Sequence, residues 1–341
     1  MLKRYGKIIE NSHIASKQGL NVIGVFNPGV VFYNNKYYMF VRVAETGNNT
    51  DGMITIPIYE SGKVITRTFD KNDQRFDFSD SRVVKYDGGQ YLTSMSRLVL
   101  FESVDGYNFN VNNNVTLEPS DDYESYGIED PRMVVIDEVV HIIYVCVSKY
   151  GICSRLKITK DFKNFEDLGI ILHPDNKDAC LFPKKINGKY YLLHRPSTSV
   201  MGKPEIWLAE SDDLIHYGNH KHIASCGIKG FDELRIGSSS QPIETKDGWL
   251  LIYHGCDNNI TYSLGAMLLD KNNPSKVLKR SKKPFVFPTE DYEKNGFMPN
   301  VIFSCNAVLS GDSLKIYYGA CDNHTCLLEI DLFDLLASLE D

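Results

Sequence analysis

The sequence predicts an all-β protein, a five-bladed β-propeller with a short C-terminal helix. Three observations lead to this prediction. Short runs rich in Val, Ile, Tyr and Phe alternate with Asn-Gly, Asp-Gly and Asn-Asn turns along most of the 341 residues. A pair of strand patterns recurs five times. Helical periodicity is convincing only in residues 332–340, with a weaker indication in the first 20 residues.

The repeated unit consists of two strand patterns. The first is an apolar strand, a turn and a Tyr- or Trp-rich strand, and it occurs at residues 30–43, 133–147, 182–196, 242–255 and 307–320. The second is a strand that ends in a polar turn, and it occurs at residues 98–109, 155–165, 206–217, 266–278 and 326–336. Two hairpins make a four-stranded antiparallel unit, and a unit repeated at roughly 50–70 residues is typical of a propeller. Since one unit cannot bury both of its faces alone, we expect five blades packed radially.

A further strand-turn-strand pattern at residues 82–96 interrupts the first unit. It lacks a second hairpin of its own, so we interpret it as part of an insertion in the first blade at about residues 50–96. We therefore expect residues 1–341 to form a single propeller domain. The alternative is a six-bladed propeller, in which residues 82–96 begin a separate blade.

Composition and charge exclude several classes of protein. The chain is 43% hydrophobic and 24% charged, which is ordinary for a globular protein. A formal net charge of -7 argues against general binding of nucleic acid or of anionic membranes. The N-terminal residues carry no apolar signal segment, and we expect a cytoplasmic protein. The eight cysteines form no CxxC pair, so we expect buried, reduced thiols and no zinc site.

A propeller binds its ligand where the innermost strands converge, so the residues that begin these strands are the candidates for chemistry. These stretches are residues 26–29, 127–132, 176–183, 235–242 and 297–307. Four of the five hold polar or charged residues that a structural strand start does not need.

The stretch GIEDPR contains adjacent carboxylates, Glu129 and Asp130, followed by Pro131 and Arg132. Neighbouring side chains of a strand point to opposite faces, so we expect only one of the two to face the channel. A carboxylic acid there can serve as the general acid that cleaves a glycosidic bond, with its pKa raised by burial. The alternative is a simple turn, because Asp-Pro commonly begins one.

Four cationic residues occur at equivalent points of the repeat. They are Lys177, Arg195, Arg235 and His254. A propeller would bring them together, and convergent cations bind phosphate through charge-assisted hydrogen bonds. The alternative for each residue is a solvated surface charge. Ser238, Ser239 and Ser240 could add hydrogen bonds to a sugar or phosphate, or simply form a loop.

These stretches resemble glycoside hydrolase family 130, which contains mannoside phosphorylases and mannosidases. The shared stretches are residues 26–29, 127–132, 176–197, 236–255, 264–280 and 316–322. They span nearly the whole chain, and the segment from residue 176 is the most specific. Residues 42–45, 77–82 and 291–297 look closest to members that act on β-1,2-linked mannosides.

The resemblance implies a five-bladed propeller with Asp130 as the general acid. It implies that Lys177, Arg195, Arg235 and His254 bind phosphate. The candidates for substrate binding are Asn27, Arg42, Arg97, Asp178, Tyr262 and Asp322. The chain departs from many relatives at residues 238–241 and at Arg235, where many carry Lys.

We therefore predict inverting phosphorolysis of β-mannosides, most consistent with β-1,2-linked oligosaccharides, to give α-mannose 1-phosphate. A phosphorylase needs an acid and a cationic cradle, since phosphate arrives already anionic. The first alternative is an inverting β-mannosidase, which would need a second carboxylate as base, from Glu233 or Glu244. The second is a non-catalytic propeller that binds a sugar or a protein. We expect no metal and no organic cofactor, only phosphate as co-substrate and a β-mannoside oligosaccharide; homo-oligomerisation stays open.

Overall fold

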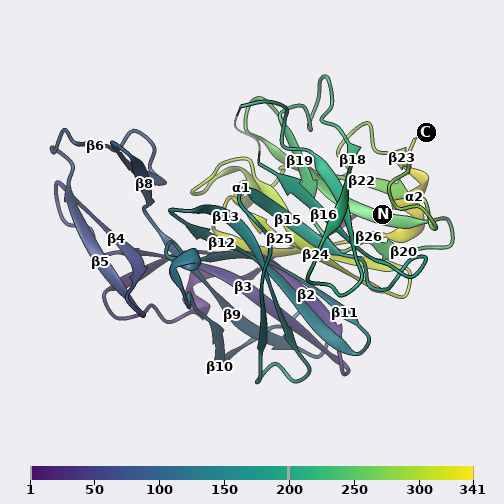
Figure 1. Ribbon diagram of the computed structural model, residues 1–341, viewed down its shortest axis with the longest axis horizontal. Coiled ribbons are helices and arrows are strands. Elements are labelled where there is room, and N and C mark those ends of the chain that lie inside the picture. The colour runs from purple at the N-terminus through teal and green to yellow at the C-terminus, as the bar shows by residue number, and fades with distance from the viewer. Residues whose placement is uncertain (1, 198–199, 341) are drawn as a thin grey trace.

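A computed structural model describes residues 2–197 and 200–340 of the chain (Figure 1). Strands dominate, and most belong to five antiparallel sheets. The helices within these ranges are short: α1 (Asp291–Lys294), α2 (Leu332–Ala337), and the 3-10 helices η1 (Asn11–His13) and η2 (Asp122–Glu124). None of the described helices is long and apolar enough to cross a membrane. Helix α2 confirms the short C-terminal helix predicted from the sequence.

The five sheets follow one another along the chain. Sheet 1 consists of β2 (Leu20–Tyr33), β3 (Lys36–Gly47), β9 (Met95–Ser103) and β10 (Asn110–Leu117). Sheet 2 consists of β11 (Ile128–Ile136), β12 (Val139–Ser148), β13 (Gly151–Thr159) and β14 (Glu166–Leu172). Sheet 3 consists of β15 (Asn176–Leu181), β16 (Tyr190–Pro196), β17 (Ile206–Ser211) and β18 (Gly218–Ala224). Sheet 4 consists of β19 (Arg235–Ser238), β21 (Trp249–Cys256), β22 (Tyr262–Leu269) and β23 (Val277–Arg280), with β20 (Ile243–Glu244) paired to β21. Sheet 5 consists of β24 (Ile302–Ser310), β25 (Ser313–Ala320), β26 (His324–Asp331) and β1 (Lys3–Ile9).

The turns of the repeat explain why the strand patterns recur. Two-residue turns with left-handed backbone, at 34–35 and 137–138, join the first two strands of sheets 1 and 2. This is the hairpin geometry that Asn and Asp tolerate best. The polar turn that follows the third strand of sheets 1 to 3 centres on one aspartate each, Asp105, Asp161 and Asp213. Each of these carboxylates accepts hydrogen bonds from the backbone N–H groups two and three residues ahead.

Sheet 5 differs from the prediction at both ends of the chain. Residues 326–336 were predicted to supply the second hairpin of the fifth unit, but they contain one strand and then helix α2. The fourth strand is β1, whose pairing with β26 runs from Lys3↔Glu329 to Ile9↔Thr325. The weak helical indication in the first 20 residues is therefore wrong for β1. A pattern of local residues cannot show that a terminal strand pairs with a strand more than 300 residues away.

The insertion forms two small sheets between β3 and β9. One pairs β4 (Met53–Glu60) with β5 (Lys63–Asp70), and the other joins β6 (Phe76–Asp77), β7 (Val83–Tyr86) and β8 (Gly89–Leu92). They extend to one side of the five sheets, at the left of Figure 1. A hydrophobic cluster that includes Ile58, Leu92 and Val145 packs this insertion against sheet 2.

Each sheet packs against the next through buried apolar side chains. Five hydrophobic clusters join successive sheets, and the fifth joins sheet 5 back to sheet 1. One pair of residues from each cluster shows which sheets it joins. The pairs are Phe40 and Ile142 for sheets 1 and 2, Ile143 and Leu192 for sheets 2 and 3, Leu193 and Leu251 for sheets 3 and 4, Leu250 and Ile316 for sheets 4 and 5, and Tyr317 and Val41 for sheets 5 and 1. First strands are also in contact, since β2 touches both β11 and β24. This closed order of contacts is consistent with the predicted five-bladed propeller.

Candidate active site

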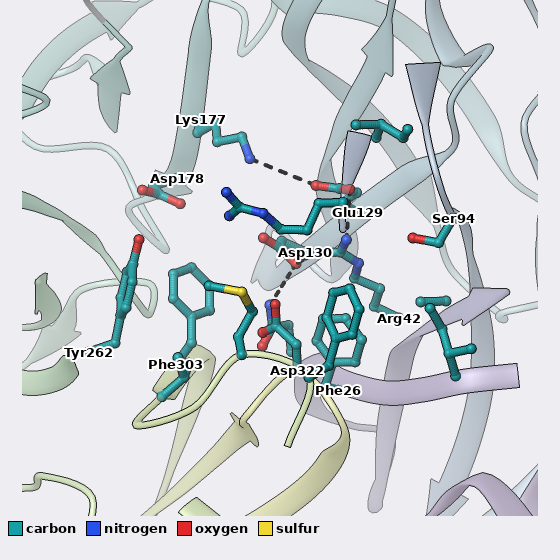
Figure 2. Close-up of a pocket in the computed structure, with 18 of the residues that line it drawn as sticks. Phe26, Arg42, Ser94, Glu129, Asp130, Lys177, Asp178, Tyr262, Phe303 and Asp322 are labelled. Atoms are coloured by element: carbon teal, nitrogen blue, oxygen red, sulfur yellow. Dashed lines mark hydrogen bonds and ion pairs between the residues drawn. The ribbon is translucent and has the colours of Figure 1, made fainter. Parts of the chain in front are cut away.

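The first strands of the sheets surround a cavity of about 290 Å³ (Figure 2). Its walls carry most of the residues singled out from the sequence. They are Asn27, Arg42, Asp130, Lys177, Asp178, Arg195, Arg235, Tyr262 and Asp322. These residues come from four of the five sheets and from the turn after β25, so their convergence is a product of the packing of the sheets.

Three of the first strands carry the same irregularity where they reach the cavity. In β2, β11 and β15 the pairing register shifts around Asn27, Asp130 and Asp178. Each of these residues has a left-handed backbone, with φ of 49°, 47° and 55°. Asn and Asp accept this conformation more readily than other side chains. A bulge of this kind turns a side chain that regular pleating would direct away.

The prediction that only one of Glu129 and Asp130 faces the channel is wrong. Both line the cavity, although neighbouring side chains of a regular strand point to opposite faces. Lys177 and Asp178 are also neighbours that both line the cavity. The Asp-Pro sequence therefore marks a bulge within β11 that presents two adjacent carboxylates to one space.

Arg42 connects these two carboxylates. Its Nη2 donates to Glu129 Oε1 at 2.7 Å and its Nη1 donates to Asp130 Oδ1 at 3.1 Å. Its Nε donates to Ser96 Oγ at 3.0 Å, which fixes the plane of the guanidinium. Asn27 Nδ2 donates a further bond of 2.9 Å to Asp130 Oδ1. The Asp130 carboxylate is thus held in one orientation, with its side chain 8% exposed.

The charges around Asp130 decide its protonation. Burial raises the pKa of the Asp130 carboxyl, but the charges of Arg42 and Lys177 and the amide of Asn27 outweigh burial, so its pKa lies below the ordinary value. The expectation that burial raises the pKa of Asp130 above its ordinary value is therefore wrong. The expectation considered burial and left out the cations that the fold places beside the carboxyl.

Asp322 differs from Asp130 because its pKa is raised above the ordinary value. Burial raises its pKa to about 6, because the attraction of Arg42 is offset by the like charges of Asp130 and Glu129. The Arg42 guanidinium donates hydrogen bonds to Glu129 and Asp130, and it acts on Asp322 through electrostatic attraction. Near pH 6 Asp322 therefore takes up a proton more readily than Asp130 does.

Three of the four predicted cations reach the cavity. Lys177 Nζ lies 3.8 Å from Glu129 Oε2, and Arg195 Nε lies 3.1 Å from Asp178 Oδ2. Arg235 Nε is buried with no hydrogen-bond partner among the described residues. In Figure 2, Asp178 and Tyr262 lie on one side of Asp130, while Arg42 and Ser94 lie on the other.

His254 is placed differently from the other three. It is fully buried, its Nδ1 lies 3.2 Å from Ser239 Oγ, and its Nε2 lies 3.4 Å from Asp178 Oδ2. Burial lowers the pKa of His254 in spite of the adjacent Asp178 carboxylate. It does not form part of the cavity wall, so the structure places it behind Asp178.

Asp178 is the centre of a buried ionic cluster. Arg132 Nη2 donates to its Oδ1 at 2.9 Å, and Arg195 and His254 approach its Oδ2. Burial alone raises the pKa of Asp178, but these partners together hold it well below the usual range. The site also depends on Gly237, where a Cβ would overlap Asp178 Oδ2 and His254.

Several residues raised by the sequence lie outside the cavity wall. Arg97 is buried in a bidentate pair with Glu45, with distances of 3.0 Å and 3.1 Å. Glu233 and Glu244, the bases considered for hydrolysis, are also absent from the wall. Glu244 pairs with Lys184 at 2.6 Å. Neither glutamate therefore lines the cavity in which Asp130 lies.

The cavity wall also includes residues that the sequence analysis did not single out individually. They include Phe26, Phe297, Met298 and Phe303, which lie in the candidate stretches 26–29 and 297–307, and Arg82, Leu92 and Ser94. Arg82, Leu92 and Ser94 come from or border the insertion, so the insertion is part of the site. The stretches 77–82 and 291–297, which look closest to family members acting on β-1,2-linked mannosides, each contribute one residue to the cavity wall, Arg82 and Phe297. Within the described ranges, no group of three or more His, Cys, Asp or Glu side chains could hold a metal ion.

Comparisons with known proteins agree on one family. The family model described as β-1,4-mannooligosaccharide phosphorylase, of glycoside hydrolase family 130, matches residues 81–341. A β-1,2-mannobiose phosphorylase of Listeria innocua serovar 6a is 40% identical over 330 residues, which is 95% of this chain and 93% of that protein. A 1,2-β-oligomannan phosphorylase of Thermoanaerobacter sp. (strain X514) is 40% identical over 252 residues, 72% of this chain and 81% of that protein.

Solved structures extend the likeness to three dimensions. The complex of β-1,2-mannobiose phosphorylase from Listeria innocua with β-1,2-mannobiose superposes with a TM-score of 0.95 at 38% identity, covering 99% of this chain and 98% of that one. A structure described among family 130 hydrolases that target β-1,2-mannosidic linkages in Candida mannan has a TM-score of 0.72 at 19% identity, covering 95% of this chain and 90% of that one. The second likeness shows the fold alone.

Proposed function

Since the chain belongs to glycoside hydrolase family 130 and is a β-mannoside phosphorylase, we propose that it cleaves β-1,2-linked manno-oligosaccharides with inorganic phosphate and inversion at the anomeric carbon. The products are α-mannose 1-phosphate and an acceptor shortened by one unit. The β-1,2 linkage is supported by the names of the 40%-identical relatives, whereas the family model is described by a β-1,4 substrate.

One observation carries the proposal: three cations and one oriented carboxylate line the same small cavity. Lys177, Arg195 and Arg235 lie in one wall region with Asp178 and Tyr262, and Asp130 faces the same space. Phosphate needs no general base, because it is already a nucleophilic anion; it needs to be held in line with the anomeric carbon. We assign the three cations to phosphate and Asp130 to proton transfer.

His254 receives an indirect role. Because it is fully buried and contacts Asp178, it positions that carboxylate, which in turn orients Arg195. We therefore propose that His254 supports the phosphate site through Asp178. Asn27, Arg42, Asp178, Tyr262 and Asp322 remain the proposed sugar contacts, each from a position on the cavity wall.

The low pKa of Asp130 requires a source for its proton. Phosphate bound beside Lys177 offsets one of the positive charges that hold the Asp130 pKa down. Phosphate binding should therefore raise the pKa of Asp130 and favour its protonated form only in the loaded site. By resemblance to the family, the proton then passes through a sugar hydroxyl to the glycosidic oxygen, so Asp130 need not touch that oxygen.

We also infer that the five sheets are the blades of a five-bladed propeller. The support is the closed order of contacts, in which buried clusters link each sheet to the next and sheet 5 to sheet 1. Strand β1 completes the last blade and ties the N-terminal segment into it.

The test is cleavage of β-1,2-mannobiose and β-1,4-mannobiose with and without phosphate. We expect mannose and α-mannose 1-phosphate from the β-1,2 disaccharide and no cleavage in phosphate-free buffer. Proton NMR of the mannose 1-phosphate should show the α configuration. Equal rates with and without phosphate would refute the proposal in favour of hydrolysis. Faster cleavage of the β-1,4 disaccharide would refute the linkage alone.

A further inference from the structure

Arg132 is a buried cation behind the wall of the active-site cavity, two residues after Asp130 in β11. Its side chain is 4% exposed and does not line that cavity. The space that it does line, with Cys180 and Gln241, has a volume of about 10 Å³, and a single water molecule already needs about 10–15 Å³. Arg132 therefore acts on other groups of the protein and does not bind a substrate directly.

The guanidinium of Arg132 holds acceptors from three sheets. Its Nη1 donates to the backbone oxygen of Asp130 at 3.2 Å, within sheet 2. Its Nη2 donates to Asp178 Oδ1 of sheet 3 at 2.9 Å and to the backbone oxygen of Ser238 of sheet 4 at 3.0 Å. Because a guanidinium is planar and rigid, these bonds fix the three acceptors relative to one another.

Two of these acceptors belong to the bulges that present carboxylates to the cavity. Asp130 and Asp178 both line the cavity (Figure 2), and both have left-handed backbone. The strand pairing skips both residues, because the register shifts at these points of β11 and β15. A buried backbone group outside the regular pairing needs another partner, and Arg132 supplies it at the Asp130 carbonyl.

Stability alone does not explain a buried arginine at this place. A buried ion pair loses much of its attraction to the cost of removing both charges from water, and apolar residues of similar size often replace it without loss. Apolar residues cannot, however, bond to three acceptors at once. The contacts of Arg132 therefore indicate that its contribution is geometric.

The proposed reaction needs the two bulges at a fixed separation. The proposed acid is Asp130, and Asp178 Oδ2 lies 3.1 Å from Nε of Arg195, one of the cations assigned to phosphate. The acid and the phosphate act on the same sugar unit, so an error of about 1 Å between them can lower the rate about 10²-fold. Since Arg132 bonds to both bulges, it controls this separation.

We propose that Arg132 is a positioning residue of the reaction, which fixes the Asp130 bulge relative to Asp178 and so aligns the acid with bound phosphate. This inference rests on the proposed function, because it takes Asp130 as the acid and Asp178 as the support of a phosphate-binding cation. The alternative is that Arg132 only holds the three sheets together.

Arg132→Lys separates the two roles. Lysine keeps the positive charge beside Asp178 but lacks the planar fork, so it cannot hold all three acceptors in the same geometry. At a temperature at which circular dichroism shows the variant to be folded, we expect kcat for phosphorolysis of β-1,2-mannobiose to fall about 10–100-fold. The KM for phosphate should rise about threefold or more. A purely structural role would lower the melting temperature and leave both constants of the folded enzyme unchanged.

Arg155→Lys is the matched control. Arg155 is also a mostly buried cation, paired with Asp121, Glu124 and Asp167, and it does not line the active-site cavity. Its replacement should lower the melting temperature and keep the wild-type kcat and KM for phosphate. Wild-type constants in folded Arg132→Lys, or losses no larger than those of Arg155→Lys, would overturn the inference.

A second comparison applies if Arg132→Lys does not fold. The double variant Arg132→Met with Asp178→Asn removes both members of the ion pair, so neither is left buried without the other. Asp178→Asn alone keeps an amide oxygen for Arg132 and leaves the bonds to the Asp130 and Ser238 carbonyls in place. We expect kcat of the double variant to lie about tenfold below that of Asp178→Asn. Equal values of kcat would contradict a positioning role.

The wild-type assay keeps this inference apart from the proposed function. Cleavage of β-1,2-mannobiose that does not depend on phosphate would overturn the proposed function, and this inference with it. Phosphate-dependent cleavage by the wild type, together with unaffected Arg132 variants, would overturn this inference alone.

Discussion

Arg42 Nη1 lies 3.1 Å from Asp130 Oδ1, so the proposed acid of the reaction is in direct contact with a guanidinium group. The same guanidinium contacts Glu129 at 2.7 Å. This relationship explains why the pKa of Asp130 is low although the residue is buried. It also means that the effects of substitutions in this cavity depend on how each carboxylate shares Arg42.

Asp130→Asn should lower kcat by about 10²–10⁴, the usual contribution of a positioned general acid. The amide keeps the size and the left-handed backbone that φ of 47° demands, so the melting temperature should stay near that of the wild type. Initial rates and thermal unfolding check the two expectations. Glu129→Gln is the matched control, since it removes the neighbouring carboxylate on the same guanidinium, and a smaller loss is expected. Full activity of Asp130→Asn would disprove the assignment of the acid.

Arg235→Ala should raise the KM for phosphate by about tenfold or more, the effect of losing one charge-assisted hydrogen bond. Stability should change little, because Arg235 Nε has no hydrogen-bond partner among the described residues.

Arg195→Ala should weaken phosphate binding and also lower the free energy of unfolding, since it leaves buried Asp178 with one fewer cation. Phosphate kinetics and urea unfolding separate the two. Lys184→Ala, which alters an exposed pair with Glu244, is the control. An unchanged KM for phosphate in Arg235→Ala would contradict the assignment of Arg235 to phosphate binding.

Asp322→Asn should make the protein more stable above about pH 6. The folded state raises the pKa of Asp322 to about 6, whereas an unfolded Asp titrates near 3.9. Above the folded pKa the ionised carboxylate is therefore less favourable in the folded protein, at a cost of about 3 kcal/mol. The cost disappears as pH falls below about 4, where both states are protonated. Urea unfolding at pH 4 and pH 8 measures the difference. A variant whose advantage is equal at both pH values would contradict this account, and activity should fall if Asp322 binds sugar.

Arg97→Ala should cost about 3–5 kcal/mol of stability, because it leaves Glu45 buried without its partner. The double variant Arg97→Met with Glu45→Leu should recover most of that loss, since apolar residues of similar size often replace a buried pair without penalty. Its KM for the mannoside should stay close to the wild-type value, because neither residue lines the cavity. A raised KM in the double variant would show that Arg97 contributes to substrate binding after all.

Local patterns predicted much of the fold because the turns depend on local chemistry. Asn34 and Asn35 adopt the left-handed backbone that a two-residue hairpin needs, and Asp161 caps a turn through its own backbone neighbours. Such signals recur in several of the units and can be read from a few residues. Strand β1 could not be read in this way, because its partner β26 is distant in the chain and the pairing depends on ring closure.

In the candidate site, too, some features were predictable from local sequence and others depend on residues distant in the chain. The repeat and its polar strand starts identified Asp130, Lys177, Arg195 and Arg235 as residues that converge. The bulges that turn both Glu129 and Asp130 into one space were not predicted, because a bulge depends on the partner strand as well as on the bulged residues. The burial of His254 and Arg97 away from the cavity wall was not predicted for a related reason: a sequence shows the charge of a side chain but not what covers it.

The sequence by itself determined the all-β class, the count of repeated units, the family resemblance and the set of polar residues available for chemistry. Each of these depends on neighbours in the chain or on residue type. The tertiary structure decided which strand closes the last sheet, which cations face the cavity, and that the pKa of Asp130 lies below its ordinary value. These properties depend on distances between residues that lie far apart in the chain. Since electrostatic energies vary with distance and burial, packing alone could set them.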